Sequence, residues 1–128
     1  MFGFNKKVVK KVMVVEDDAL LAQVLATTLK KENFEVIVVA DGLEALETAK
    51  KMHPSIILLD LILSGIDGFE VLKKLKGESK TAHIPVAVIS NLDSVSDVRS
   101  TKVLGAEKFF VKANTKLDEI VKFVKSKT

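Results

Sequence analysis

The chain has 128 residues, 48% of them hydrophobic, which is enough for the core of one ordinary domain. It contains no cysteine, so disulfides, thiolate metal sites and cysteine nucleophiles are excluded. The net charge is only +3, the lysines accompany no nucleic-acid recognition motif, and no signal peptide or run of about 18 apolar residues is present. We therefore expect a cytoplasmic protein that binds neither nucleic acid directly nor a membrane.

The first predicted strand, residues 10–15, ends at a cluster of acidic residues. Its apolar run, Val12–Val15, is followed directly by Glu16, Asp17 and Asp18. Leucines at helical spacing then predict a helix, and Asp18 is a suitable cap for its start. These leucines are Leu21, Leu25 and Leu29.

Four more strands are predicted by short apolar runs that are rich in valine, isoleucine or phenylalanine. They cover residues 35–40, 56–60, 85–90 and 108–112. The last three end in Asp60, Ser90 and Lys112, so each finishes on a polar or charged side chain. In the last strand Phe109 and Phe110 should face opposite ways, which puts one ring in the core and the other near the surface.

Three further segments show helical spacing of differing strength. Phe69, Leu72 and Leu75 recur every three residues, and the clearest helical pattern lies near the C-terminus. The residues of that C-terminal pattern are Leu117, Ile120, Val121 and Val124. Between residues 94 and 104 the apolar residues are sparse, so we expect a loosely packed helix there, capped by Ser94.

Apolar strands that alternate with helices predict an α/β fold. Such strands belong to a parallel sheet with helices on both faces, and right-handed connections make the sheet doubly wound. The carboxyl ends of parallel strands meet at one edge, where open sheets of this kind bind ligands. The sequence therefore predicts that Glu16, Asp17, Asp60, Ser90 and Lys112 lie close together.

These residue types at one edge point to a divalent cation and to phosphoryl chemistry. Carboxylate oxygens are suitable ligands for Mg2+, and the cation offsets the repulsion between the acids. A carboxylate beside such a cation can accept a phosphoryl group as an aspartyl-phosphate, with Asp60 as the acceptor. Lys112 and Ser90 can bind phosphoryl oxygens. An isolated aspartate at a strand end is just as often a cap or turn residue, so it is the partners of Asp60 that favour the chemical role.

Four segments, in order along the chain, resemble the receiver domain of two-component response regulators. They are Val14–Asp18, Leu58–Gly68, Ile84–Ser90 and Leu104–Lys112. The resemblance covers residues 11 to about 125 and implies a receiver domain at residues 11–126, preceded by an N-terminal extension at 1–10. It also implies a flavodoxin-like fold, with five parallel strands in the order 2-1-3-4-5 and five helices.

The resemblance implies a metal and an acceptor at the sheet edge. Asp60 would be the phosphoryl acceptor, and Asp17 would be a direct ligand of Mg2+ or Mn2+. Glu16 would bind a water molecule of the metal, and the backbone carbonyl of Ile62 would complete the protein ligands.

The resemblance also implies switching and lifetime-tuning residues. Ser90 would be the switch hydroxyl, Lys112 would pair with the phosphate, and Phe109 would be the switch aromatic. Ile62 and Leu92 stand at the two positions that tune the lifetime of the phosphorylated state. Because both are apolar and cannot orient an attacking water, we expect a long-lived aspartyl-phosphate.

Three positions depart from the family pattern. Ala113 follows Lys112 where a cis-bonded proline is usual, and a cis bond to a non-proline residue costs about 2.5–4 kcal/mol. We therefore expect a trans bond and an altered loop at 113–115. Ser64 stands where proline is common, and we expect it to loosen the loop after the acceptor. Asn91 stands where a small residue is usual, and we expect it either to narrow access of the phosphodonor or to add a hydrogen bond to the phosphate.

The sequence thus predicts a phosphoacceptor that takes a phosphoryl group from a histidine kinase or phosphotransfer protein. It would catalyse only its own phosphorylation and dephosphorylation. Phosphorylation should change the surface of the fourth helix, fifth strand and fifth helix, where a downstream protein would bind. The basic C-terminal helix favours an acidic partner surface. We expect a monomer or a phosphorylation-dependent dimer.

Three alternatives remain open. A phosphohydrolase also forms an aspartyl-phosphate, but it usually needs a second acid two residues after the nucleophile, where this chain has Ile62. A pseudo-receiver would act only as a protein-binding module, and loss of Asp60 or of the acid pair would favour it, whereas all are present. The third is the receiver fragment of a DNA-binding regulator. Val98 and Val103 do not suit the charged dimer face of such regulators, so a stand-alone regulator is favoured.

Overall fold

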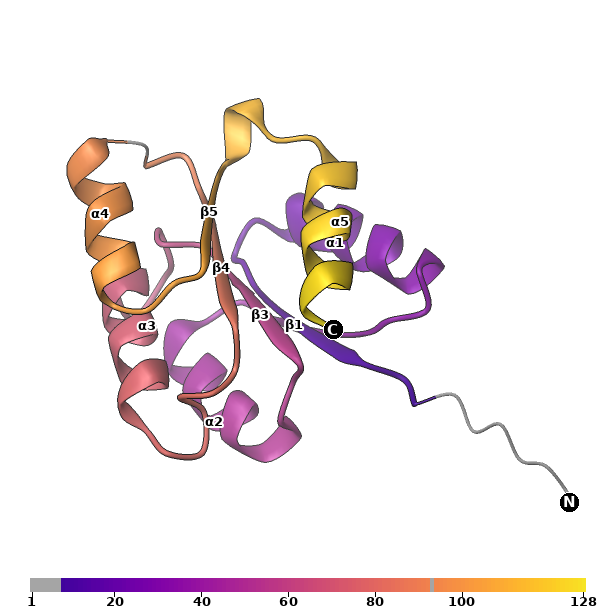
Figure 1. The fold of residues 1–128 in the computed structure, drawn as a ribbon, viewed down its shortest axis with the longest axis horizontal. Coiled ribbons are helices and arrows are strands. Elements are labelled where there is room, and N and C mark those ends of the chain that lie inside the picture. Colours follow the sequence, from indigo (N-terminus) through magenta and orange to yellow (C-terminus); the bar gives the residue numbers. More distant parts are fainter. Residues whose placement is uncertain (1–7, 93) are drawn as a thin grey trace, which may run out of the picture.

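Five parallel strands form one sheet in the order β2-β1-β3-β4-β5, and helices cover both of its faces (Figure 1). The structure is a computed structural model that describes residues 8–92 and 94–128, so most of the predicted N-terminal extension lies outside the described residues. The elements are β1 (Lys11–Val15), α1 (Ala19–Lys31), β2 (Glu35–Val39), α2 (Gly42–Met52), β3 (Ile56–Leu59), α3 (Gly68–Gly77), β4 (Val86–Ser90), α4 (Val95–Val103), β5 (Lys108–Val111), the 3-10 turn η1 (Lys112–Asn114) and α5 (Leu117–Lys127).

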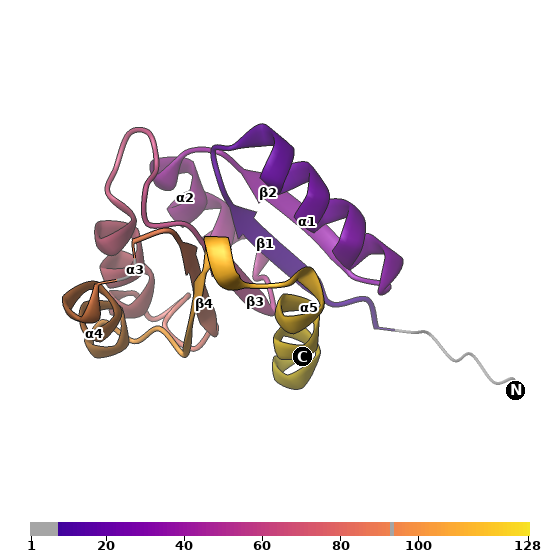
Figure 2. The same ribbon diagram turned by 90° about the horizontal axis from the view of Figure 1, so that it is seen from above.

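The sheet separates two apolar cores. The helices α2 and α3 lie on one side of the sheet, and α1 and α5 lie on the other (Figure 2). Met13 and Val15 of β1 point into the core that α2 and α3 cover. Val12 and Val14 point into the opposite core, under α1 and α5. Because both faces of the central strands are buried, these strands are apolar apart from Lys11 at the start of β1 and Ser90 at the end of β4, and the predicted doubly wound fold is confirmed.

Side chains cap the N-termini of four of the described helices. Asp18 accepts hydrogen bonds from the first turn of α1, and Ser94 does the same for α4, as the sequence predicts. Asp41 and Asp67, which stand at predicted element boundaries, cap α2 and α3 in the same way.

The helix α4 is loosely packed, as expected from its sparse apolar residues. Thr101 is its only buried residue. Val95 is 73% exposed and Val103 is 80% exposed, so the apolar side chains at both ends of this helix face solvent. Most of the surface of α4 is therefore available for other contacts.

None of the described helices reaches the length and hydrophobicity that crossing a bilayer requires. This agrees with the absence of a long apolar run in the sequence.

Replacing Gly77 by alanine is expected to stabilise the fold by about 0.5–1 kcal/mol. Gly77 is the last residue of α3, and a Cβ atom built there meets no other atom within 4 Å. Alanine would therefore restrict the unfolded chain without a clash in the folded one. Urea denaturation of the two proteins measures the difference in free energy of unfolding.

Gly68→Ala is the matched control at the other end of the same helix. A Cβ atom at Gly68 would lie 2.6 Å from the carbonyl oxygen of Asp60, so this variant should lose about 1–3 kcal/mol. Equal effects of the two substitutions would contradict the packing described for α3.

Candidate functional site

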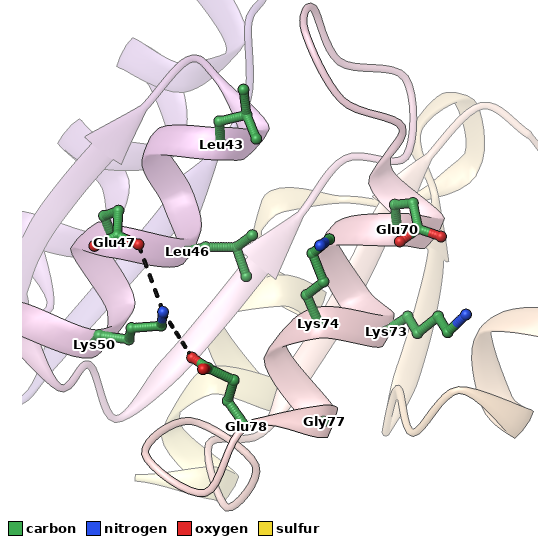
Figure 3. Close-up of a pocket in the computed structure, with 9 residues that line it drawn as sticks. All are labelled: Leu43, Leu46, Glu47, Lys50, Glu70, Lys73, Lys74, Gly77 and Glu78. Atoms are coloured by element: carbon green, nitrogen blue, oxygen red, sulfur yellow. Dashed lines mark ion pairs between the residues drawn. The ribbon is translucent and has the colours of Figure 1, made fainter.

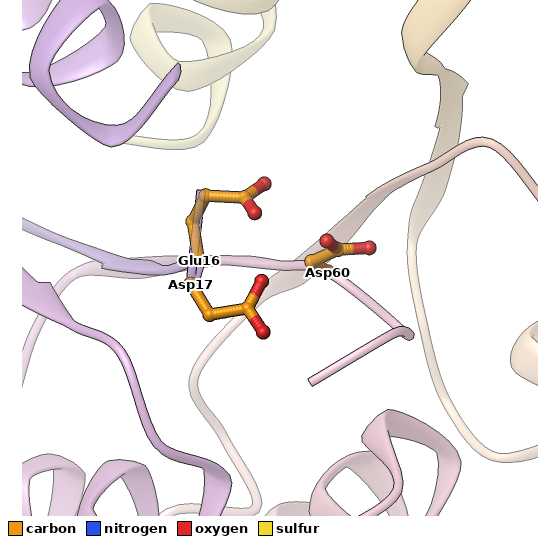
Figure 4. Close-up of side chains that lie close together, drawn as sticks. All are labelled: Glu16, Asp17 and Asp60. Carbon is orange, nitrogen blue, oxygen red and sulfur yellow. The ribbon is translucent and has the colours of Figure 1, made fainter. Parts of the chain in front are cut away.

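Three carboxylates gather at the carboxyl edge of the sheet (Figure 4). Glu16 and Asp17 follow β1, and Asp60 follows β3, the neighbouring strand. The hydrogen bonding of the sheet continues past the strand ends, because the amide of Asp60 donates to the carbonyl of Val15 at 3.0 Å. One carboxylate oxygen from each acid lies within 4.8 Å of the other two. The predicted convergence of these acids is confirmed.

Lys112 lies between the two buried acids of this cluster. Glu16 is 3% exposed and Asp60 is 4% exposed, whereas Asp17 faces solvent. The Lys112 Nζ is 2.8 Å from Glu16 Oε1 and 2.8 Å from Asp60 Oδ2. One ammonium group thus neutralises only part of the charge of three carboxylates, which leaves the site net negative and suited to a divalent cation.

Burial and charge set the protonation of this site. Burial raises the pKa of the Glu16 carboxyl above its ordinary value, and the nearby charge of Asp60 adds to this, although the hydrogen bond from Lys112 opposes it. Burial disfavours the charge on Lys112, but its hydrogen bonds to Asp60 and Glu16 outweigh that effect and raise its pKa. The charged form of the lysine is therefore favoured, whereas burial disfavours the negative form of Glu16, a cost that a bound cation would relieve.

The remaining oxygens of the cluster have backbone or side-chain partners. Asp60 Oδ1 accepts from the Ile62 amide at 3.2 Å, so both oxygens of this carboxylate are oriented. Glu16 Oε2 accepts from the Asp18 amide at 3.1 Å. The donor set of oriented carboxylate oxygens fits Mg2+ or Mn2+, both of which prefer oxygen ligands.

Ser64 ties the loop after β3 to the acid cluster. Its hydroxyl donates to Asp17 Oδ2 at 3.2 Å, and the residue also forms an isolated bridge with Asp41. The expectation that Ser64 loosens this loop is therefore not supported, because its hydroxyl forms a hydrogen bond to the acid cluster that a proline could not form.

The predicted switch residues lie on β4 and β5. Ser90 ends β4, is fully buried, and accepts a hydrogen bond from the Leu92 amide at 3.2 Å. Phe109 is half-buried against the core under α2 and α3, whereas Phe110 is buried on the opposite face, with its ring edge-on to Phe123. The prediction that one ring belongs to the core and the other lies near the surface is confirmed.

Ile62 and Leu92 line one shallow hollow beside the acid cluster. The hollow has a volume of about 390 Å³, and Gly65, Asp67 and Phe69 also border it. Ile62 is 56% exposed, and its amide donates to Asp60 Oδ1, so this apolar side chain stands next to the predicted acceptor.

The bond before Ala113 has the trans form that the sequence predicts. The bond between Lys112 and Ala113 is trans, and the chain turns through η1. The Asn91 Oδ1 accepts a hydrogen bond from the Ala113 amide at 3.2 Å, so this oxygen is already paired with the turn after β5. The contact of Ser64 with Asp17 joins residues that are 47 positions apart, and that of Asn91 with Ala113 joins residues 22 positions apart. No motif spacing in the sequence predicts either contact.

A larger groove, of about 750 Å³, lies between α2 and α3 (Figure 3). Leu43 and Leu46 form part of its wall, and Lys50 pairs with Glu47 and Glu78 across one end. None of the acid-cluster residues borders this groove, so it is a separate feature of the surface.

Comparison with known proteins agrees with the geometry. The family model of the response regulator receiver domain matches residues 12–125. A probable transcriptional regulator, ycf27 of Porphyridium aerugineum, is 36% identical over 103 residues, which are 80% of this chain and 42% of that protein. The chain spans less than half the length of the curated relatives it matches first.

Solved structures resemble the chain over nearly its whole length. A putative response regulator from Chloroflexus aurantiacus has a TM-score of 0.87 at 27% identity, covering 94% of this chain and 98% of that one. The Mn2+-bound form of response regulator Rcp1 has a TM-score of 0.80 at 28% identity, covering 91% and 92%. With these matches, the strand order and the acid cluster, the chain belongs to the response regulator receiver domain family.

Proposed function

We propose that this chain is a phosphoacceptor, which takes a phosphoryl group from a histidine kinase or phosphotransfer protein onto Asp60. The observation that carries the proposal is the position of Asp60: it is buried, oriented through both oxygens, and placed beside two further acids and Lys112. The domain boundaries, residues 11–126, are part of the same proposal.

The metal would be Mg2+ or Mn2+, held by Asp17, Asp60 and the backbone carbonyl of Ile62, with Glu16 binding one of its waters. When bound, it would offset the charge of the acids and of the incoming phosphoryl group. An oxygen of Asp60 then attacks phosphorus, the bond from phosphorus to the donor's imidazole nitrogen breaks, and that nitrogen keeps the electron pair. The Mn2+-bound Rcp1 structure supports this choice of ion by resemblance.

Lys112 and Ser90 would hold the phosphoryl oxygens after transfer. Lys112 already lies 2.8 Å from Asp60, whereas the Ser90 hydroxyl accepts from its own loop and would have to turn toward the phosphate. Phe109 would move inward as Ser90 leaves its position, which would change the surface of α4, β5 and α5. That surface would bind the downstream protein, and the loose packing of α4 supports such a change.

Replacing Ile62 by asparagine and Leu92 by glutamate together should shorten the life of the aspartyl-phosphate by about tenfold or more. Polar side chains in the hollow beside Asp60 could orient an attacking water, whereas the native apolar pair cannot. Decay of the phosphorylated form, followed by intact mass after removal of the donor, measures the effect. Val103→Asn on α4 is a matched apolar-to-polar control, and an unchanged decay in the double variant would refute the shielding role.

Intact mass spectrometry after incubation with phosphoramidate, with and without Mg2+, tests the proposed function. We expect a gain of one phosphoryl group that depends on the metal. A folded protein that gains no mass with either Mg2+ or Mn2+ would overturn the proposal in favour of a pseudo-receiver that acts as a protein-binding module.

A further inference from the structure

Two loops that carry the proposed phosphate-binding groups are joined by one hydrogen bond. The loop after β4 begins at Ser90, and the turn after β5 begins at Lys112. Between these loops, the Ala113 amide donates to Asn91 Oδ1 at 3.2 Å. Each partner in this bond directly follows one of the two phosphate-binding residues along the chain.

Apart from the two ion pairs of the Lys112 side chain and the connection to β5, the main chain of the turn that carries Lys112 has few restraints among the described residues. The 3-10 turn η1 has no side-chain cap at its start. The Thr115 hydroxyl donates to the Val111 carbonyl at 2.7 Å, which joins the end of the turn to the last residue of β5 but makes no contact with the loop after β4. The bond from Ala113 to Asn91 is the one that fixes this turn to the neighbouring loop.

Alanine at position 113 makes this contact possible, because its amide hydrogen is available to the Asn91 side chain in the loop after β4. Proline at this position would have no such hydrogen. The loop after β4 is fixed in turn by its own bond, from the Leu92 amide to Ser90 Oγ. Two positions that depart from the family pattern are therefore partners in one contact.

We infer that Asn91 is a positioning residue, which holds Lys112 in line with Asp60 by accepting the hydrogen bond of the Ala113 amide. This role rests on the proposed function, since the reaction that Lys112 assists is phosphoryl transfer to Asp60. Asn91 acts through the main chain of the lysine and has no contact with the reacting atoms. Asn91 thereby aligns the Lys112 ammonium group with the phosphoryl oxygens, which carry negative charge during transfer. Loss of this alignment should lower the rate of the chemical step.

Asn91→Ala is expected to lower the rate of phosphorylation at saturating phosphoramidate by about three- to tenfold, as loss of one hydrogen bond implies. The donor concentration at half-maximal rate should change by less than about twofold, because donor binding keeps its contacts. Asn91→Asp, which keeps an acceptor oxygen at the same place, should recover most of the rate. Thr115→Val, which removes the bond within the turn, is the control for a merely structural effect.

Ala113→Pro separates this role from a direct contact of Asn91 with the phosphate. In that background the donor hydrogen is absent, so adding Asn91→Ala should change the rate by less than about twofold. If Asn91→Ala lowers the rate equally in both backgrounds, or if Thr115→Val lowers it as much as Asn91→Ala does, the positioning role is overturned.

Amide hydrogen exchange tests the contact without any phosphorylation. The Ala113 amide should exchange faster in Asn91→Ala than in the native protein, while the amides of β1 and β3 remain unchanged. If the native protein is not phosphorylated at all but this exchange difference is found, the proposed function fails and the contact stands. If the native protein is phosphorylated but the Ala113 amide exchanges equally in both, the positioning role fails alone.

Discussion

Replacing Asp60 by alanine is expected to abolish phosphoryl uptake, with the rate falling by more than about a thousandfold. Both oxygens of the Asp60 carboxylate are oriented, one by the Ile62 amide and the other by Lys112. We do not expect the neighbouring acids to replace it, because Asp60 follows β3, which lies next to β4 and its Ser90, whereas Glu16 and Asp17 follow β1, one strand further away. Time courses of intact mass with phosphoramidate and Mg2+ measure the loss.

Asp118→Ala is the control for this substitution. Asp118 is an exposed acid in the first turn of α5, outside the acid cluster, and its loss should leave uptake unchanged. Circular dichroism must show that Asp60→Ala still folds. A folded Asp60→Ala protein that still gains a phosphoryl group at the native rate would mean that another residue is the acceptor.

Replacing Lys112 by methionine should lower the free energy of unfolding of the metal-free protein at pH 7 by about 3 kcal/mol. Methionine fills a similar volume but leaves the buried carboxylates of Glu16 and Asp60 without their cation. Saturating Mg2+ should reduce this difference, because without Lys112 the two carboxylates should bind the ion more tightly than in the native protein, and each tenfold gain in affinity adds about 1.4 kcal/mol to the variant. Urea denaturation with and without Mg2+ measures both quantities.

The decrease in the free energy of unfolding caused by Lys112→Met should depend on pH, and it should be larger at higher pH. Burial raises the pKa of Glu16 in the folded state, so the folded protein binds its proton more tightly than the unfolded one. This contribution to stability is present below the ordinary pKa and is lost as the pH rises through the raised one. Without Lys112 the pKa of Glu16 should rise further, so the deficit of the variant should be smaller at pH 4 than at pH 7.

Lys76→Met is the control for removal of a half-buried lysine. Lys76 donates to the carbonyls of Ala82 and Ile84 rather than to the acid cluster. Its removal should cost stability, and Mg2+ should stabilise this variant and the native protein equally, so the difference between them should not change. A loss in Lys112→Met that is likewise insensitive to Mg2+ and to pH would contradict the electrostatic role of Lys112.

The sheet and the acid cluster could be predicted from the sequence because their signals are local. Buried parallel strands such as Ile56–Leu59 are apolar at each position, and the first polar residue after each strand marks the same edge. Since topology fixes which strands are neighbours, placing Asp60 beside Glu16 requires no long-range information beyond the fold.

The helix α2 shows why some elements give weak signals. Its buried residues are Gly42, Ala45 and Ala49, which are small because α2 and α3 pack close together. A Cβ atom at Gly42 would lie 2.7 Å from Val71 of α3. The buried residues of this face have helical spacing, but glycine and alanine are little more hydrophobic than their neighbours. A search for large apolar residues at helical spacing therefore does not predict this helix.

The contacts of Ser64 and Asn91 depend on three-dimensional detail that the sequence does not carry. Each is a single polar bond between loops, to Asp17 in one case and to Ala113 in the other. A polar side chain in a loop can form hydrogen bonds with many different partners. A departure from the family pattern shows that the contacts of that position differ, but it does not identify the new partner. The structure was needed to connect Asn91 with Ala113.

The most direct test of phosphoryl transfer to Asp60 is to locate the group after reaction with phosphoramidate and Mg2+. Borohydride reduces an acyl phosphate to an alcohol, so peptide mapping by mass spectrometry identifies the acceptor residue. We expect one modified residue per chain, Asp60, and no modification when the metal is chelated. Modification of a different residue, or of Asp60 to the same extent without a divalent ion, would contradict a metal-assisted phosphoacceptor site.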